Sequence, residues 1–247
     1  LEEALEKHKN IDVITLTANG EPTLYPHLEA LIDAILPLKQ NKKLLILSNG
    51  STIADLSIQQ ALLKLDIVKL SLDCVSPTCF KKLDRPHKDV HITSIIEGMK
   101  TFRAKFKKEL VIEILVVETL NDSLEEFQAL NTTLQSIQPD RIDISTIDRP
   151  PAYAVKGVSI ERLLELASVI ENLHVNIAYK KNYVPEKRSF SEEEILELLK
   201  RRPQSSEDVR LCFDEESIQR LETLQRNRNV FTKSIAGVDF YKVNEDV

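Results

Sequence analysis

Short apolar runs alternate with amphipathic helical patterns along the first three quarters of the chain, and this alternation limits the possible folds strongly. The runs are rich in β-branched residues and lie at 11–17, 44–47, 67–73, 111–117 and 141–147, with a shorter one at 174–178. Between them apolar residues recur at helical spacing, as at Leu28, Leu31, Ile32 and Ile35. Strands separated by helices of this length predict right-handed βαβ units and a parallel sheet.

The number of these units limits how the sheet can close. Five strand–helix units are too few for a closed eight-stranded barrel, which takes about 250 residues. We therefore predict an α/β fold in the form of a partial parallel (β/α) barrel that lacks its first strand. A doubly wound open sheet is the alternative, and the pattern alone does not separate the two. The chain starts at Leu1 without Met, and we expect it to be a fragment.

The alternation of predicted strands and helices ends near residue 183. Residues 183–188 are predicted to be a linker, and helices are predicted to begin near Ser191, Ser205 and Asp214. Residues 230–243 alternate as a hairpin would around Ala236 and Gly237. Three helices and a hairpin are typical of a winged-helix-like domain. We predict a barrel domain at 1–182, the linker at 183–188 and a winged-helix-like domain at 189–247.

The charge of the chain disfavours a nucleic-acid surface on either domain. The net charge is −6, and residues 189–247 carry 13 Asp and Glu against 9 Lys and Arg, a net charge of −4. A helix that enters the major groove of DNA beside phosphates should be basic, whereas the predicted third helix of this tail is acidic. We expect this tail to dock on a protein or to pack within the chain rather than to bind DNA. No run approaches the roughly 18 apolar residues of a membrane span, so we expect a cytoplasmic protein.

The chain has three cysteines, Cys74, Cys79 and Cys212. They are too few and too irregularly spaced for a disulfide framework, and they match no common metal spacing. We predict that Cys74 and Cys79 are two half-buried thiols, and that no metal ligands lie in this chain.

Polar residues follow the ends of the predicted strands, at Glu21, Asn49, Asp73, Asn121 and Arg149. Ligands bind at the carboxyl ends of the strands in parallel α/β folds. Glu21 stands between a glycine and Pro22, which force a sharp turn and aim its carboxylate, an arrangement that suits an ammonium or hydroxyl group. The alternative is an ordinary strand-to-helix turn in which a negative charge is mildly favourable.

Six short motifs occur in register with these strand ends. They are Gly-Glu-Pro-Thr-Leu at 20–24, Asn-Gly at 49–50, Ser-Leu-Asp at 71–73, Arg-Pro-His at 85–87, Asn-Asp at 121–122 and Arg-Pro-Pro at 149–151. Together they resemble the radical S-adenosylmethionine (radical SAM) enzymes from the second to the sixth barrel strand. The most similar subgroup is that of wyosine-type tRNA-modifying enzymes and Fe–S oxidoreductases. The match departs from the usual motif where Asn19 takes the place of a first glycine.

The resemblance implies contacts for each motif. Asn19, Gly20, Glu21 and Pro22 would bind the methionine part of SAM, with the Glu21 carboxylate holding its amino group. The remaining implied residues are Asn49, Ser71 and Asp73 on the nucleoside and carboxylate side, Asn121 on the far wall, and Arg85, His87 and Arg149 at the substrate mouth. For His87 an ordinary surface histidine is the alternative.

The resemblance also implies a 4Fe–4S cluster on a CxxxCxxC loop, which this chain does not contain. Three thiolates would hold the cluster and leave one iron open for SAM. We expect those cysteines upstream of Leu1. The full-length protein would then take an electron from a donor and cleave SAM reductively to a 5′-deoxyadenosyl radical. That radical would act on an unknown substrate, with tRNA as one candidate, and this chain alone would be inactive.

Two other functions are compatible with the residues. A cluster-free barrel hydrolase or lyase would use Glu21 and Asp73 as paired carboxylates for acid–base chemistry. A non-enzymatic interaction module would make its main contacts through the winged-helix-like tail.

Overall fold

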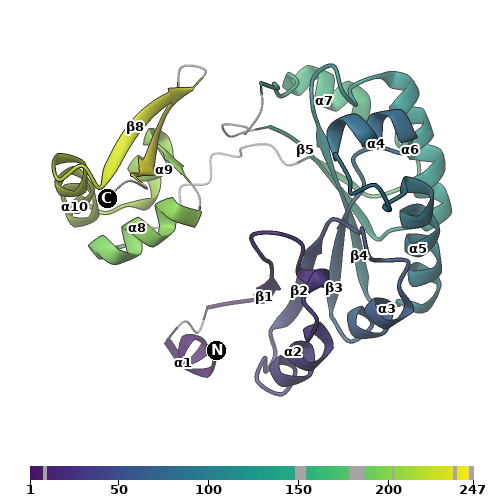
Figure 1. Cartoon of the computed structure of the whole chain (residues 1–247), viewed down its shortest axis with the longest axis horizontal. Helices are drawn as coiled ribbons and strands as arrows, with labels where there is room; N and C mark the ends of the chain where they lie inside the picture. The colour runs from purple at the N-terminus through teal and green to yellow at the C-terminus, as the bar shows by residue number, and fades with distance from the viewer. Residues whose placement is uncertain (8–9, 148–153, 178–186, 202, 236–237, 245–247) are drawn as a thin grey trace. The chain divides into compact units, whose positions relative to one another are not determined.

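The structure, a computed structural model, describes residues 1–7, 10–147, 154–177, 187–201, 203–235 and 238–244. The chain divides into two compact units, Leu1–Tyr179 and Lys180–Val247, shown in Figure 1. Each unit has its own apolar core. Among the described residues no helix is long and apolar enough to cross a membrane.

The first unit alternates strands and helices, as the apolar runs predict. Its described strands are β1 (Val13–Leu16), β2 (Lys43–Ser48), β3 (Ile67–Ser71), β4 (Glu109–Val116), β5 (Arg141–Thr146) and β6 (Val175–Ile177). Its described helices are α1 (Glu2–Lys7), α2 (Leu28–Ile35), α3 (Leu56–Leu62), α4 (Pro77–Leu83), α5 (Ile92–Lys105), α6 (Leu124–Ile137) and α7 (Ile160–Ala167).

The six strands form one parallel sheet in which every strand pairs with its neighbours in the chain, in the order β1-β2-β3-β4-β5-β6. A doubly wound sheet needs a reversal of strand order, and the described strands contain none, which excludes that alternative for this part of the chain. Helices α3, α5, α6 and α7 follow one another along the outer side of the curved sheet (Figure 1).

The two faces of the sheet differ in composition. Alternate residues of a strand point to opposite faces. One set packs with the helices in the main core and is fully buried, and it includes Leu44, Ile46, Val68, Leu70, Ile112, Ile114, Ile142 and Ile144. The intervening positions carry Lys69, Glu113 and Asp143. We call the side that carries these three residues the inner face.

Helix α4 and the state of two cysteines depart from the sequence predictions. Residues 77–83 are helical, because Pro77 starts the first turn and the Ser76 hydroxyl caps it by accepting from the Cys79 amide. This turn brings Cys79 back to Cys74, and the two form a disulfide. The prediction of two half-buried thiols is therefore wrong, since both residues are buried and joined.

The second unit contains α8 (Glu192–Arg201), β7 (Gln204–Ser205), α9 (Ser206–Cys212), α10 (Glu215–Arg226), β8 (Val230–Ile235) and β9 (Val238–Val243). The three predicted helices and the hairpin strands are present, and residues 236–237 between the strands lie outside the described part. The strand β7 was not predicted, and it pairs antiparallel with β9 to give the sheet order β7-β9-β8. Ser191 and Glu194 form the predicted capping box, since each side chain accepts from the other residue's amide.

Candidate functional site

The loop after β1 holds Glu21 in a fixed position at the carboxyl edge of the sheet. A 3₁₀ turn at Pro22–Leu24 follows, and Glu21 caps it. The Glu21 Oε1 atom accepts from the Thr23 amide at 3.0 Å and from the Thr23 hydroxyl at 2.6 Å. The carboxylate is half-buried, so one side of it remains open to solvent. The prediction of an aimed carboxylate is consistent with these bonds.

The loop after β2 meets the loop after β1 through the same carboxylate. The Asn49 amide donates to Glu21 Oε2 at 2.7 Å, and the Asn49 side chain accepts from the Ser51 amide at 2.9 Å. Gly50 has a φ of +73°, a conformation that glycine adopts without strain. A Cβ atom there would lie 3.1 Å from Met99 Cε, so the tight turn is also closely packed. The structure thus brings Glu21 and the Asn49 backbone together.

The Asn121 side chain forms hydrogen bonds with the backbone at the ends of β3 and β4. Its side-chain amide donates to the carbonyls of Asp73 and Leu115, both at 2.8 Å, and its Oδ1 atom accepts from the Val117 amide at 2.7 Å. The side chain is 1% exposed. The sequence predicts a direct cofactor contact at Asn121, but both amide hydrogens are used on the backbone. In this structure Asn121 positions the loops after β3 and β4, and its contact with a cofactor stays a prediction.

Asp73 continues the inner face beyond the end of β3. Burial raises the pKa of its carboxyl to about 7, although the Leu115 amide, which donates to Oδ1 at 2.7 Å, opposes the shift. The negative charges of Asp84 and Glu113 act in the same direction as burial. Because this pKa lies near neutrality, Asp73 can hold or release a proton under ordinary conditions.

A cluster of charged residues on the inner face was missing from the sequence predictions. We call Lys69, Glu113, Arg141 and Asp143 the inner-face cluster. The Lys69 ammonium lies 2.7 Å from Glu113 Oε1 and 3.0 Å from Asp143 Oδ2, and Arg141 Nε lies 2.9 Å from Asp143 Oδ1. Asn176 on β6 also donates to Asp143, at 3.2 Å. The cluster therefore spans three neighbouring strands, β3 to β5, and the bond from Asn176 links it to β6.

Ion pairing within this cluster favours the charged forms of Lys69 and Asp143. Burial acts to lower the pKa of Lys69, but the hydrogen bonds to Glu113 and Asp143 outweigh it, and the pKa is raised. Burial likewise acts to raise the pKa of Asp143, whereas the bonds from Arg141, Lys69 and Asn176 lower it overall. The cluster therefore places charges of both signs at fixed positions on the inner face.

The sequence does contain a signal for this cluster. Lys69, Glu113 and Asp143 each lie between two buried apolar residues of their strand. Glu113 stands opposite Asp143 in the strand register, and Lys69 lies two residues before Ser71, the β3 partner of Glu113. A charge between apolar neighbours in each of three strands, always on the same side of the sheet, indicates a face that helices do not cover.

The remaining predicted site residues are Ser71, Arg85, His87 and Arg149. Ser71, half-buried, ends β3 opposite Glu113. Arg85 is exposed with a φ of +49°, and His87 is exposed, with its Nδ1 atom 3.3 Å from Asp89. His87 lines a pocket of about 330 Å³ between α4 and the start of α5. Arg149, with the rest of the motif at 149–151, lies outside the described residues.

Comparison with known proteins gives consistent matches. A sequence model of the radical SAM superfamily matches residues 1–130. A UPF0026 protein of Helicobacter pylori strain J99 is 39% identical over 233 residues, which are 94% of this chain and 75% of that protein.

Two solved structures have a similar fold. A radical SAM methyltransferase from Sphaerobacter thermophilus matches with a TM-score of 0.57 and 15% identity, over 73% of this chain and 54% of that one. SuiB from Streptococcus suis, solved with S-adenosylmethionine bound, matches with a TM-score of 0.56 and 23% identity, over 79% of this chain and 47% of that one. At these identities the likeness is one of fold.

Proposed function

The chain belongs to the radical SAM superfamily, and on that premise we propose that its first unit is the SAM-binding part of a radical SAM enzyme. The observation that carries the proposal is the Glu21 carboxylate at the carboxyl edge of the sheet. It is held by the Asn49 amide and by Thr23, and its open side can accept from the amino group of methionine.

The backbone next to this carboxylate is not crowded by other protein atoms. A Cβ atom placed on Gly20 would meet no protein atom within 4 Å, so the backbone of the loop is open there. We propose that Asn19, Gly20 and Pro22 contact the methionine part of the cofactor, while Asn49, Ser71 and Asp73 line its other side. Asn121 would act on affinity only indirectly, through the loops that it holds.

The described residues do not fit a 4Fe–4S cluster. The chain has three cysteines, two are joined in a disulfide, and Cys212 belongs to the second unit. A cluster that leaves one iron open needs three thiolates in one loop region. The cluster loop upstream of Leu1 and the electron donor therefore stay predictions. SAM and the cluster, when both are bound, supply the 5′-deoxyadenosyl radical, whereas the residues of this chain bind and orient.

A titration tests the proposal directly. SAM is titrated by calorimetry into the full-length protein with its cluster reconstituted, as wild type, as Glu21→Gln and as Glu29→Gln. The Glu21→Gln variant loses the charge that pairs with an ammonium, so we expect its affinity for SAM to fall at least about 10-fold. Glu29 lies on the exposed side of α2, and its variant should bind as wild type does. Equal affinities in all three proteins would overturn the assignment of Glu21.

The hydrolase hypothesis has less support. It needs Glu21 and Asp73 to act as a pair, but each carboxylate accepts from a separate set of donors, Thr23 and Asn49 for Glu21 and Leu115 for Asp73. If that hypothesis were right, the chain would act without iron, and Glu21→Gln would abolish that activity.

The inner-face cluster supports a polar substrate for this site. We propose that the substrate binds over Lys69, Glu113 and Asp143, which offer donors and acceptors on three neighbouring strands. The tRNA that the wyosine resemblance implies stays a hypothesis. The net charge of −6 gives it no electrostatic support.

We further propose that the second unit is a winged-helix-like domain that docks on a protein. Its element order, with a short strand between the first two helices and a hairpin after the third, is typical of that fold. The acidic residues of α10 pair with their own arginines, Arg220 with Glu216 and Arg226 with Glu222, which leaves little net positive field for DNA. Deleting residues 189–247 should abolish partner binding in a pull-down while SAM binding persists.

A further inference from the structure

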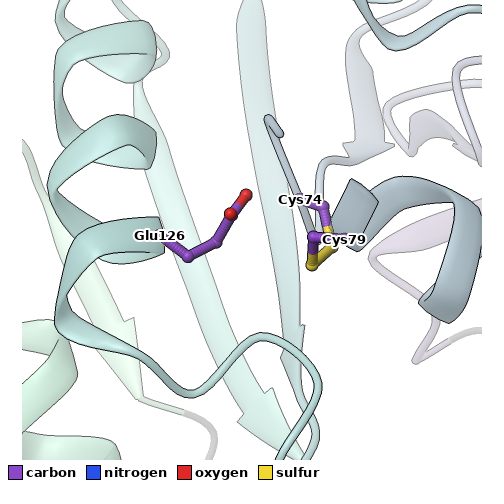
Figure 2. Close-up of side chains that lie close together, drawn as sticks. All are labelled: Cys74, Cys79 and Glu126. Atoms are coloured by element: carbon purple, nitrogen blue, oxygen red, sulfur yellow. A yellow bond between two sulfur atoms is a disulfide. The ribbon is translucent and has the colours of Figure 1, made fainter. Parts of the chain in front are cut away.

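Cys74, Cys79 and Glu126 bring three metal-ligand atoms together beneath the loop that follows β3. One ligand atom from each residue lies within 4.8 Å of the other two. Figure 2 shows the Glu126 carboxylate extending from α6 toward the two sulfur atoms. All three residues are buried, with exposed fractions of 1%, 6% and 9%. Soft thiolates and a carboxylate in one buried place form a ligand set that suits zinc.

The Glu126 carboxylate is held in place by the same loop. Its Oε1 atom accepts from the Val75 amide at 2.6 Å and from the Ser76 amide at 3.0 Å, and its Oε2 atom accepts from the Ser76 hydroxyl at 2.7 Å. Hydrogen bonds of this kind orient metal ligands from outside the coordination sphere. Glu126 still has acceptor capacity left, because a carboxylate offers about four lone-pair sites and the loop uses three.

The surroundings also suit the reduced form of the cysteine pair. Cys79 Sγ lies 3.5 Å from the Leu120 carbonyl oxygen. A disulfide sulfur has no hydrogen to donate, so this contact becomes a hydrogen bond only when Cys79 is a thiol. In a reducing compartment such as the cytoplasm, which the sequence predicts for this protein, the reduced pair would be the resting state.

We propose that the reduced Cys74–Cys79 pair and Glu126 bind one thiophilic divalent cation such as Zn²⁺. A dithiol reductant first transfers two electrons and two protons to the disulfide and is itself oxidised to a disulfide. The two thiols then release two protons as two metal–sulfur bonds form. The fourth tetrahedral position falls to a solvent molecule or to a backbone carbonyl. The disulfide and the metal exclude each other, because both use the same sulfur atoms.

The site would stabilise the loop that carries Asp73. Cys74 follows Asp73 directly, and Asn121 already ties the Asp73 carbonyl to the end of β4. A metal bound to Cys74 and to Glu126 on α6 would add to the hydrogen bonds by which Glu126 already holds this loop. The proposal is independent of SAM binding. Two thiolates are also fewer than the three that a SAM-binding iron–sulfur cluster needs.

Cobalt binding tests the site, because Co²⁺ replaces Zn²⁺ and its thiolate bonds give an ultraviolet charge-transfer band. The 247-residue chain is titrated with Co²⁺ after reduction by a dithiol that is then removed, and again after oxidation. We expect one equivalent with the band in the reduced protein and none in the oxidised one. Cys74→Ser, Cys79→Ser and Glu126→Gln should each weaken binding at least about 10-fold. The matched control, Cys212→Ser, changes the remaining cysteine and should bind as wild type does.

A second measurement uses the wild-type chain and does not depend on variant folding. Zn²⁺ should slow alkylation of Cys74 and Cys79 at least about 10-fold, while Cys212 reacts at an unchanged rate. The proposal fails if reduced protein shows no thiolate band, or if zinc leaves the alkylation of Cys74 and Cys79 unchanged. It also fails if Cys74→Ser binds Co²⁺ as tightly as wild type does.

Discussion

The two faces of the six-stranded sheet are built from alternate residues of the same strands, yet they differ in what they contain. The helix-side face of β2 to β5 is formed by fully buried aliphatic residues. The inner face carries Lys69, Glu113, Arg141 and Asp143, which pair with one another. The first face contributes burial of apolar area, and the second contributes charge in fixed positions.

This difference shows how one strand can serve stability and recognition together. Since successive side chains point to opposite sides, a substitution at one position leaves the other face largely unchanged. The comparison predicts that the same substitution at two neighbouring residues of one strand changes the stability of the fold by very different amounts.

The largest effect is expected from a pair of adjacent substitutions in β2. Ile46 is fully buried on the helix side, whereas Leu47 is half-buried on the inner face. Ile46→Ala should lower the free energy of unfolding by about 2–5 kcal/mol, because it leaves a cavity in a close-packed core. Leu47→Ala should cost about half as much, since part of this side chain already contacts solvent. Urea denaturation measures both, and equal losses would contradict the division into two faces.

A smaller loss is expected when the inner-face cluster loses its central cation. Lys69→Met leaves Glu113 and Asp143 close together without the ammonium between them, and should destabilise the fold by about 1–3 kcal/mol. Lys100→Met removes an exposed pair with Glu97 and should cost less than about 0.5 kcal/mol. The cluster would be structurally unimportant if the two variants unfolded at the same urea concentration.

A still smaller effect, dependent on pH, is expected at Asp73. Its pKa in the folded protein, about 7, exceeds the ordinary value of 3.8, so the folded state binds the proton more tightly. The stabilisation by this proton is complete below the ordinary pKa and is lost as the pH rises to about 7. Between about pH 5 and pH 8, wild type should lose ~1–2 kcal/mol more than Asp73→Asn does. Parallel pH profiles of the two proteins would show that Asp73 has an ordinary pKa.

The fold was largely predictable because its signals are local. Runs of β-branched residues and helical periodicity placed the strands and most helices, and Ser191 with Glu194 marked the start of α8 correctly. Helix α4 was missed because it spans only Pro77–Leu83, too few residues for helical periodicity to be recognised. Its cap, Ser76 followed by Pro77, is nonetheless a recognisable start signal.

The candidate site was less predictable, because its contacts depend on strand register. The sequence indicated that Glu21 and Asn49 follow neighbouring strands, but not that the Asn49 backbone donates to Glu21. It named Asn121 as a polar residue past a strand, whereas only the packed structure shows that its amide is buried against three backbone groups. The approach of Glu126 to Cys74 depends in the same way on how α6 packs beside the loop after β3.

The strands of the sheet follow one another in the same order as in the chain, and this order affects how the first unit can fold during its synthesis. Each strand of the sheet pairs with the one made just before it, so no segment has to wait for a distant partner. Pairing between near neighbours in sequence favours rapid folding. The sheet can therefore grow from its amino-terminal side while the ribosome is still extending the chain, with one exposed edge at a time awaiting the next unit.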